Sequence, residues 1–286
     1  MSNNGNDPNV TIKAPTVSRV RATWPILLLA VLFVVGAFLT WYFTWFGREL
    51  SDSDISKYLV DEKNPRHVQH ALLQIQQRIE RKDTSVKQWY PRLITLAGNP
   101  ETELRLTVAW LMGFDNQAEE FHSALLKLLT DPEPIVRRNA ALALVRFNDS
   151  SGRQELRSIL KLYPIPATAE GVLNSTLRSG SQVSRGTLLA RIQKANNEIV
   201  EVRSPLLGQV ENLMVQSGAS VREGELILNL KSDEESVWEA LRGLAIIGQA
   251  EDVSVIQHYL QETPSVSERI KEQAALTIKS IQSRKI

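Results

Sequence analysis

"NPETELRLTVAWLMGF" (residues 99–114) and "DPEPIVRRNAALALVR" (residues 131–146) decide the fold of this chain. The two stretches align without gaps at an offset of 32 residues, which places Arg105 over Arg137. Each opens with a polar residue followed by proline, a pair typical of a helix start, and continues with apolar residues at helical spacing. Self-similarity at a fixed period predicts tandem copies of one helical unit.

The same apolar spacing extends on both sides of these stretches and predicts further amphipathic helices. A third polar-proline pair stands at Asn64-Pro65, and the spacing returns between residues 237 and 281. We therefore expect helical regions at 53–163 and 233–284, the second continuing the first. The apolar positions expected to face the core are Val68, Ala71, Leu72, Ile75, Ile79, Leu104, Val108, Leu111, Met112, Val136, Ala140, Ala143, Leu144, Phe147, Val237, Ala240, Leu241, Leu244, Val253, Ile256, Leu260, Ile270, Ala274, Ile278 and Ile281.

The Asp-Pro turn at Asp131, the following Val-Arg pair and the Ala/Leu-rich helix resemble the HEAT-like repeat family. The resemblance implies paired antiparallel helices stacked into a solenoid. It also implies that Arg137 or Arg138 pairs with Asp131; an anion site near the helix start is the alternative. The 32-residue period is shorter than the usual period of about 40 to 47 residues and closer to the short units of phycobilin lyases, which leaves the class of repeat open.

Between the two helical regions, residues 164–231 change to β-branched alternation broken by glycines. Here "SGSQVSRGTLLARI" (179–192) aligns with "SGASVREGELILNL" (217–230) at an offset of 38 residues, so the segment carries an internal duplication. Glycine lacks a Cβ and is therefore the residue expected where a turn needs positive φ. The glycines expected at such turns are Gly180, Gly186, Gly218 and Gly224.

Two such halves resemble the barrel-sandwich hybrid of biotinyl and lipoyl domains, and the resemblance covers a module at 168–231. In the members that carry a cofactor, the acceptor lysine stands at the tip of the hairpin between the halves. Asn196 or Asn197 occupies that position here, and neither can form the amide. Lys194 stands two positions early, where a side chain keeps its face of the strand but loses the tip. We therefore expect the module to carry no cofactor.

Near the N-terminus, "TWPILLLAVLFVVGAFLTWYFTWF" (residues 23–46) contains no charged residue. A helix of this length reaches about 36 Å, enough to cross a hydrocarbon core of about 30 Å. We therefore expect a retained signal anchor, with a transmembrane helix at 23–47 that follows a polar tail at 1–22. The aromatic residues expected at the membrane surfaces are Trp24, Trp41, Tyr42 and Trp45.

The charges around this segment favour a cytoplasmic N-terminus, because Lys13, Arg19 and Arg21 precede it. The bulk of the chain would then lie outside the cytoplasm, at a bacterial inner membrane. The absence of cysteine suits that location and excludes disulfides and thiolate chemistry. A formal net charge of +1 without a long basic run argues against a nucleic-acid partner.

Few residues suggest a chemical site. His67 and His70 are three residues apart, a spacing that two metal ligands could share, but no third ligand stands nearby and we expect no metal. Glu119 and Glu120 are adjacent and would point to different sides of a helix, so a solvated face is expected rather than general acid–base work. The sequence thus predicts no catalytic residues.

The whole pattern predicts a multi-domain α+β protein with an N-terminal transmembrane helix and a HEAT-like solenoid interrupted by an all-β barrel-sandwich hybrid. A solenoid exposes a long surface per residue, and so small a β module is only marginally stable alone, so both gain from docking. We expect a non-enzymatic, membrane-anchored, extracytoplasmic scaffold or accessory subunit of a larger bacterial membrane complex. Its expected partners are the other subunits and the lipid bilayer, with no nucleic acid and no small-molecule substrate.

Two alternatives remain open. The first is a membrane-fusion-type adaptor of an efflux or secretion system. Such adaptors divide the two β halves by a long helical hairpin, however, and only eight residues separate Ile192 from Glu201 here. The second is a cofactor carrier with a modified Lys194, or a lyase-like solenoid that binds a tetrapyrrole.

Overall fold

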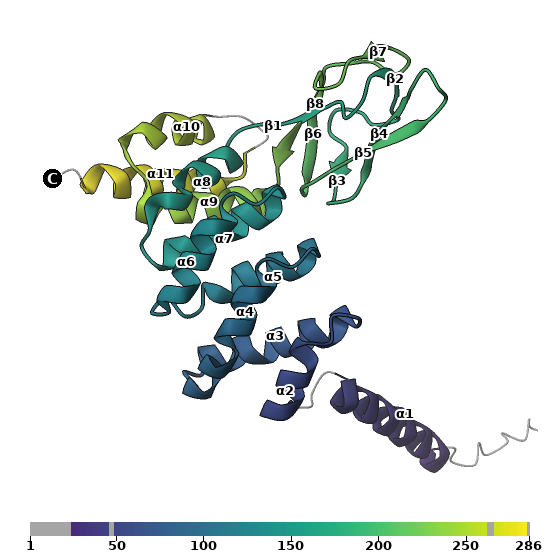
Figure 1. The fold of residues 1–286 in the computed structure, drawn as a ribbon, viewed down its shortest axis with the longest axis vertical. Helices are drawn as coiled ribbons and strands as arrows, with labels where there is room; N and C mark the ends of the chain where they lie inside the picture. Colours follow the sequence, from purple (N-terminus) through teal and green to yellow (C-terminus); the bar gives the residue numbers. More distant parts are fainter. Residues whose placement is uncertain (1–23, 46–48, 262–265, 285–286) are drawn as a thin grey trace, which may run out of the picture. The chain divides into compact units, whose positions relative to one another are not determined.

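The structure is a computed structural model that describes residues 24–45, 49–261 and 266–284. It divides the chain into two compact units, Met1–Glu49 and Leu50–Ile286. The predicted polar tail at 1–22 lies outside the described residues. The second unit is a helical array with a small antiparallel β region inserted in it (Figure 1).

The described part of the first unit is one helix, α1 (Trp24–Trp45). Its described side chains are exposed and, apart from Thr40, apolar; Trp24, Phe33 and Trp41 are 73%, 78% and 52% exposed. Tyr42 and Trp45 lie in α1, but their side chains are outside what the structure describes. No helix among the residues whose side chains are described, which in α1 are 24–25 and 27–41, is long and apolar enough to cross a membrane.

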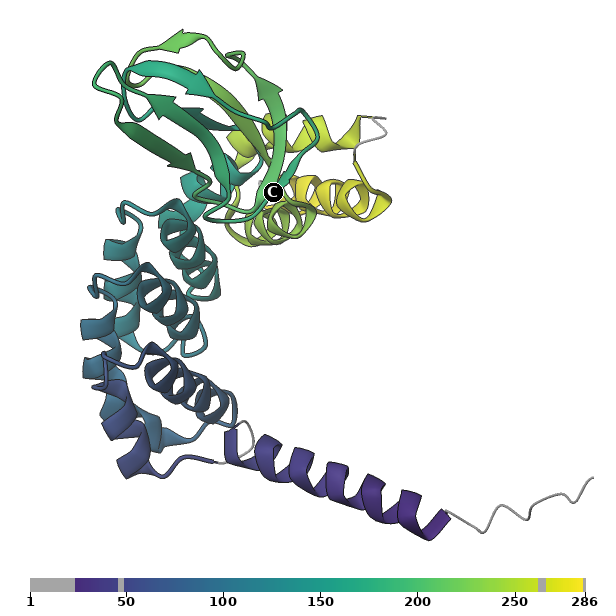
Figure 2. The same ribbon diagram turned by 90° about the vertical axis from the view of Figure 1, so that its right-hand side faces the viewer.

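The helical array of the second unit is built in two layers (Figure 2). Helices α3, α5, α7, α9 and α11 pack against one another in turn, and shorter helices pack behind them, with α6 on α7, α8 on α9 and α10 on α11. The elements are α2 (Asp52–Leu59), α3 (Pro65–Glu80), η1 (Thr84–Trp89), α4 (Tyr90–Leu96), α5 (Thr102–Met112), α6 (Glu119–Leu128), α7 (Pro134–Arg146), η2 (Ser150–Gly152), α8 (Arg153–Ile159), α9 (Glu234–Ile247), η3 (Ala250–Asp252), α10 (Val253–Gln257), η4 (His258–Leu260) and α11 (Glu268–Ser283).

Two apolar clusters fill the space between the layers. The first runs from Leu50 to Leu144. The second joins Ala141, Val145 and Leu156, which precede the β strands, to residues of α9 and α11, which follow them. The helices on either side of the strands therefore share one core.

The predicted apolar positions are buried, except that Phe147 and Val253 are partly buried and Leu260 is wrongly placed. Leu260 is 40% exposed, because α10 ends at Gln257 and the chain tightens into the 3₁₀ turn η4. A 3₁₀ turn has three residues per turn, so it rotates the inward position by comparison with an α-helix. Tyr259 is buried instead, and its hydroxyl donates to the Leu160 carbonyl at 3.0 Å.

The polar-proline pairs begin helices less uniformly than the sequence predicts. Pro65 is the first residue of α3, but its neighbour Asn64 makes no side-chain cap. At the other two pairs the helix starts later: Asn99 and Asp131 each accept a hydrogen bond from the backbone N–H two residues on. These are Asx turns, which set the direction of the chain before the helix begins.

The inserted β region consists of two four-stranded antiparallel sheets, ordered β1-β8-β6-β3 and β5-β4-β2-β7. The side chains between them form one apolar cluster, and neither sheet closes into a barrel. The strands are β1 (Tyr163–Pro166), β2 (Gly171–Asn174), β3 (Gln182–Val183), β4 (Leu188–Gln193), β5 (Ile199–Arg203), β6 (Gly208–Leu213), β7 (Ser220–Val221) and β8 (Leu226–Ser232).

The internal duplication is visible in this pairing. The short strand β3 of the first half pairs with β6 of the second, and β7 of the second half pairs with β2 of the first. A Cβ on Gly171 would lie 2.3 Å from the Gln193 carbonyl oxygen, and one on Gly208 would lie 2.4 Å from that of Lys231. The residues that contribute these two carbonyls, Gln193 and Lys231, are again 38 residues apart. The predicted turn glycines, Gly180, Gly186, Gly218 and Gly224, all have φ between +81° and +92°, which confirms that prediction.

Candidate functional site

The hairpin turn between β4 and β5 contains Asn196 and Asn197, the residues that the resemblance to biotinyl and lipoyl domains places at the acceptor position. The N–H of Lys194 donates to the Glu198 carbonyl at 2.9 Å, and the N–H of Asn197 donates to the Lys194 carbonyl at 3.0 Å. Asn197 has a φ of +64°, a left-handed conformation that asparagine tolerates well. Asn196 and Asn197 are exposed within the turn, so the structure brings both to the tip of the hairpin.

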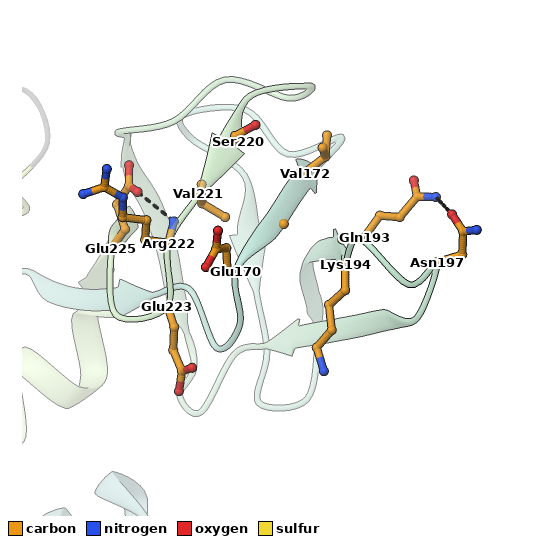
Figure 3. A pocket seen from close by; sticks show the side chains of 12 residues that line it. Glu170, Val172, Gln193, Lys194, Asn197, Ser220, Val221, Arg222, Glu223 and Glu225 are labelled. Atoms are coloured by element: carbon orange, nitrogen blue, oxygen red, sulfur yellow. Dashed lines mark hydrogen bonds between the residues drawn. The ribbon is translucent and has the colours of Figure 1, made fainter.

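Lys194 lies at the start of this turn, and its side chain leaves the chain on the side opposite to that of Gln193 (Figure 3). Its ammonium forms an ion pair with Glu198 at 3.0 Å. Hydrogen bonds from Lys194 and Asn196 hold the pKa of Glu198 below its usual value. An open hollow beside the turn is lined by Glu170, Glu223 and other polar side chains (Figure 3). That Lys194 carries no cofactor stays a prediction.

Arginine forks connect successive helical units. Arg105 of α5 donates to both carboxylate oxygens of Asp131, at 2.7 and 3.0 Å, and to the carbonyls of Asn99 and Pro100 at the start of its own unit. Both side chains are almost fully buried. Burial alone would raise the pKa of Asp131, but the hydrogen bonds from Arg105 and the Glu133 N–H outweigh it and lower that pKa.

The equivalent arginine corrects a prediction. Arg137 does not pair with the Asp131 carboxylate; it donates to the carbonyls of Asp131 and Pro132 and forms an ion pair with Glu155 at 3.3 Å. Each arginine therefore bonds to the carbonyls of its own turn and to a carboxylate that lies later in the chain. Because each arginine pairs with a carboxylate later in the chain, the partner of Asp131 is the earlier arginine, Arg105.

Arg138 is a buried cation that the sequence reasoning assigned to Asp131 or to an anion. It is 4% exposed, and its guanidinium carbon lies 5.9 Å from the centre of the Tyr163 ring. Its Nε and one terminal nitrogen have no hydrogen-bond partner, and burial lowers its pKa. Arg138 thus stands where the helices meet the first strand, held by the ring and by packing.

The two histidines considered as metal ligands have different surroundings. His67 bonds to Asp61 at 2.7 Å and stacks on Tyr58, while burial lowers the pKa of His70. Within the described ranges, no group of three metal-ligating side chains comes together. Glu119 and Glu120 are exposed at the start of α6, as predicted for a solvated face.

His122 follows them on α6 and is part of another pair. It bonds to Asp149 at 2.6 Å, with Glu119 at 3.5 Å from its other ring nitrogen. The hydrogen bond that the His122 ring donates to the Asp149 carboxylate raises the pKa of His122 above its usual value. Asp149 also caps the next turn by accepting from the Ser151 N–H. The pair therefore ties α6 to the loop that follows α7.

A cleft lined by exposed aromatic and arginine side chains lies on the helices that form one layer of the array. This cleft of about 250 Å³ opens between α5, α7 and α9, with Leu142, Ala143, Val145 and Gly243 among its apolar lining residues. Trp110 of α5 and Ile246 of α9 border it and are 43% and 51% exposed. Small residues allow the close packing beneath it: a Cβ on Gly243 would lie 2.7 Å from Leu156, and one on Gly113 3.0 Å from Ala143.

Two arginines with exposed side chains line this cleft, Arg146 of α7 and Arg242 of α9. The guanidinium of Arg146 lies 4.3 Å from the centre of the Phe114 ring, and that of Arg242 lies 4.6 Å from the Trp238 ring. Stacking on an aromatic face fixes a guanidinium and leaves its N–H groups available. Sequence reasoning missed this surface because it used apolar spacing to find buried positions. The signal was present, since Phe114 and Arg146 are one 32-residue repeat apart and Trp238 and Arg242 are four residues apart on α9.

One comparison with known proteins, the match to a family model, supports the helical repeats. A family model described as HEAT repeat matches residues 123–150, which span α6 and α7. Among solved structures, a crystallised engineered protein is 16% identical, with 80% of this chain and 78% of that chain covered and a TM-score of 0.42. A designed armadillo repeat protein is 14% identical, with 79% and 80% covered and a TM-score of 0.39. A comparison with curated sequences finds no match. The family-model match and the stacking of the helices support a repeat solenoid, a fold typical of protein-interaction scaffolds.

Proposed function

We propose that this chain is a non-enzymatic, membrane-anchored scaffold or accessory subunit of a larger bacterial membrane complex. The observation that carries the proposal is the cleft between α5, α7 and α9, where exposed Trp110 and two ring-stacked arginines line an apolar depression. Tryptophan and arginine are the residues that most often dominate protein–protein binding energy. A solenoid that presents them together on one surface is suited to hold a protein partner.

The anchor is proposed on the composition of α1. Every large apolar side chain that the structure describes in this helix is at least 43% exposed, the lowest value being that of Leu39. Exposed apolar side chains on a helix are costly in water and favourable in a lipid bilayer. The aromatic residues Trp24 and Trp41 are well placed for the two headgroup regions, since they stand near opposite ends of α1.

Membrane attachment is tested by carbonate extraction of bacterial membranes that contain the tagged full chain. We expect the full chain to stay with the pellet and a chain that lacks residues 1–48 to be released. Because the chain has no cysteine, orientation is measured with single substitutions, Ser2→Cys and Ser179→Cys, and a membrane-impermeant maleimide. Labelling of Ser179→Cys alone in intact spheroplasts supports an extracytoplasmic solenoid. Release of the full chain by carbonate refutes the anchor.

Partner binding is tested by purifying the tagged full chain in mild detergent and identifying co-purifying proteins by mass spectrometry. We expect a defined set of membrane-complex subunits at constant ratio to this chain. A chain that elutes alone as a monomer refutes the scaffold proposal.

The β module helps to separate this proposal from the alternatives. Only five residues, 194–198, connect β4 and β5, which leaves no room for the long helical hairpin of a membrane-fusion adaptor. A carrier needs an acylated amine at the tip, where Asn196 and Asn197 lie. Both features favour a module that docks over one that transports or carries.

A further inference from the structure

We propose that the cleft between α5, α7 and α9 binds an acidic segment of a partner protein, with an apolar side chain of that segment seated on the cleft floor. This inference rests on the proposed scaffold function and names the chemistry of its partner. The cleft is lined by residues from both sides of the inserted β region, since α5 and α7 precede it and α9 follows it.

The charges of the cleft determine which partner fits. Neither Arg146 nor Arg242 forms an ion pair with any residue in the described part of the chain, although most other arginines of the array do. The single acid among the lining residues is Glu239. Two cations against one anion leave a positive field over an apolar floor. Arginine forks bind carboxylates through two parallel N–H···O bonds, so aspartate or glutamate side chains complement this pair.

Both signs of charge act on Glu239, but the two acids near it have partners of their own: Glu235 pairs with Arg269, and Asp233 caps α9. Burial and the negative charges of Glu235 and Asp233 raise the pKa of the Glu239 carboxyl, while Arg242 and Arg146 lower it. The two arginines therefore act on the same point of the cleft. By contrast, Arg269 also lies over the Trp238 ring, at 4.1 Å, but it is already neutralised by Glu235 at 2.8 Å.

The size and walls of the cleft argue for a peptide side chain. Its volume of about 250 Å³ holds one or two apolar side chains, and it is bordered by exposed Trp110 and Ile246. An exposed aromatic ring beside an apolar depression becomes buried when a partner docks, and protein interfaces use such rings as anchors. The chain's own N-terminal tail is a poor occupant, because it carries Lys13, Arg19 and Arg21 against one aspartate.

The test uses an array of random ten-residue peptides probed with the purified full chain in detergent. We expect bound peptides to be enriched in Asp and Glu together with Leu, Ile or Phe. The double variant Arg146→Gln/Arg242→Gln should lower the signal of those peptides by about tenfold, as expected for the loss of two solvent-exposed ion pairs. Its matched control is Arg178→Gln/Arg222→Gln, which removes two exposed arginines from the β module and should leave the signal within about twofold by the same arithmetic.

The outcomes separate this inference from the function on which it rests. Bound peptides without acidic enrichment, or an equal signal from the cleft variant and wild type, overturn the cleft proposal. Binding of the full chain to vesicles of phosphatidylserine that the cleft variant abolishes, with no peptide preference, also overturns it in favour of a lipid headgroup. If co-purified subunits persist with the cleft variant, the scaffold function stands and the cleft proposal fails. If wild type binds acidic peptides but captures no subunit, the cleft proposal stands and the scaffold function fails.

Discussion

Replacing Arg105 by leucine tests whether the arginine forks hold neighbouring helical units together. The substitution removes the two bonds to the buried Asp131 carboxylate and the two bonds to the Asn99 and Pro100 carbonyls. Breaking a buried ion pair from one side costs about 3–5 kcal/mol, because the remaining charge is left buried without its partner. We therefore expect Arg105→Leu to lower the free energy of unfolding by about that amount.

The matched control is Arg137→Leu at the equivalent position of the next unit. It also loses two bonds to carbonyls, but its ion pair with Glu155 is longer, at 3.3 Å, and less buried. We expect a loss of about 1–2 kcal/mol, so the difference between the two variants isolates the carboxylate pairing. Urea titration of the full chain in detergent, followed by circular dichroism, measures both. Equal losses within about 0.5 kcal/mol, the usual size of a surface effect, would refute the reasoning.

The pH dependence gives a second check on the same pair. The folded-state pKa of Asp131 is lowered, so its contribution is fully present above the unfolded value of about 3.9 and is lost as pH falls through the folded pKa. The stability gap between wild type and Arg105→Leu should therefore narrow below about pH 4. A gap that stays constant from pH 7 to about pH 3 would contradict this assignment.

Three further predictions follow from local geometry. Gly208→Ala places a Cβ 2.4 Å from a main-chain oxygen of β8 and should lower the free energy of unfolding by about 2–3 kcal/mol. Gly186→Ala meets open space and only strains a φ of +82°, so it should lower it by about 1–2 kcal/mol. Thermal unfolding ranks the two variants, and a reversed order would count against the close approach at Gly208. Asp149 raises the pKa of His122, so the stabilisation from this pair is present below about pH 6.5 and is lost as pH rises through the folded pKa. The difference in melting temperature between wild type and His122→Gln should therefore shrink from pH 6 to about pH 9. A difference that widens over this range would refute the pairing. Intact-mass spectrometry of the chain purified from its host should give the unmodified mass, while a lipoyl or biotinyl adduct on Lys194 would refute the proposed absence of a cofactor.

The repeat pattern could be predicted from sequence because it depends on local rules. Apolar spacing sets which face of a helix is buried, and glycines with positive φ mark turns, so both the helical core and the turns of the β region followed from the residues. The failures occurred where the local rule changes. Leu260 is exposed because the last turn of its helix tightens to 3₁₀ geometry, which apolar spacing does not reveal.

The site could be predicted only in part, because its contacts join distant residues. The alignment placed Arg105 over Arg137 but gave no indication of which carboxylate each would reach, and the structure pairs Asp131 with the earlier one. The cleft needs α9 to return to α7 after the whole β region has intervened. No periodicity of the sequence relates Arg146 to Arg242 across that distance.

The inserted β region leaves and rejoins the helices through paired strands, since Tyr163 of β1 stands opposite Leu230 of β8. The neighbouring helices α8 and α9 pack together directly. The β region therefore leaves and rejoins the helical array at one place, between α8 and α9. At such a place the β region could be shortened, exchanged or deleted, by evolution or by engineering, while the helices keep their order.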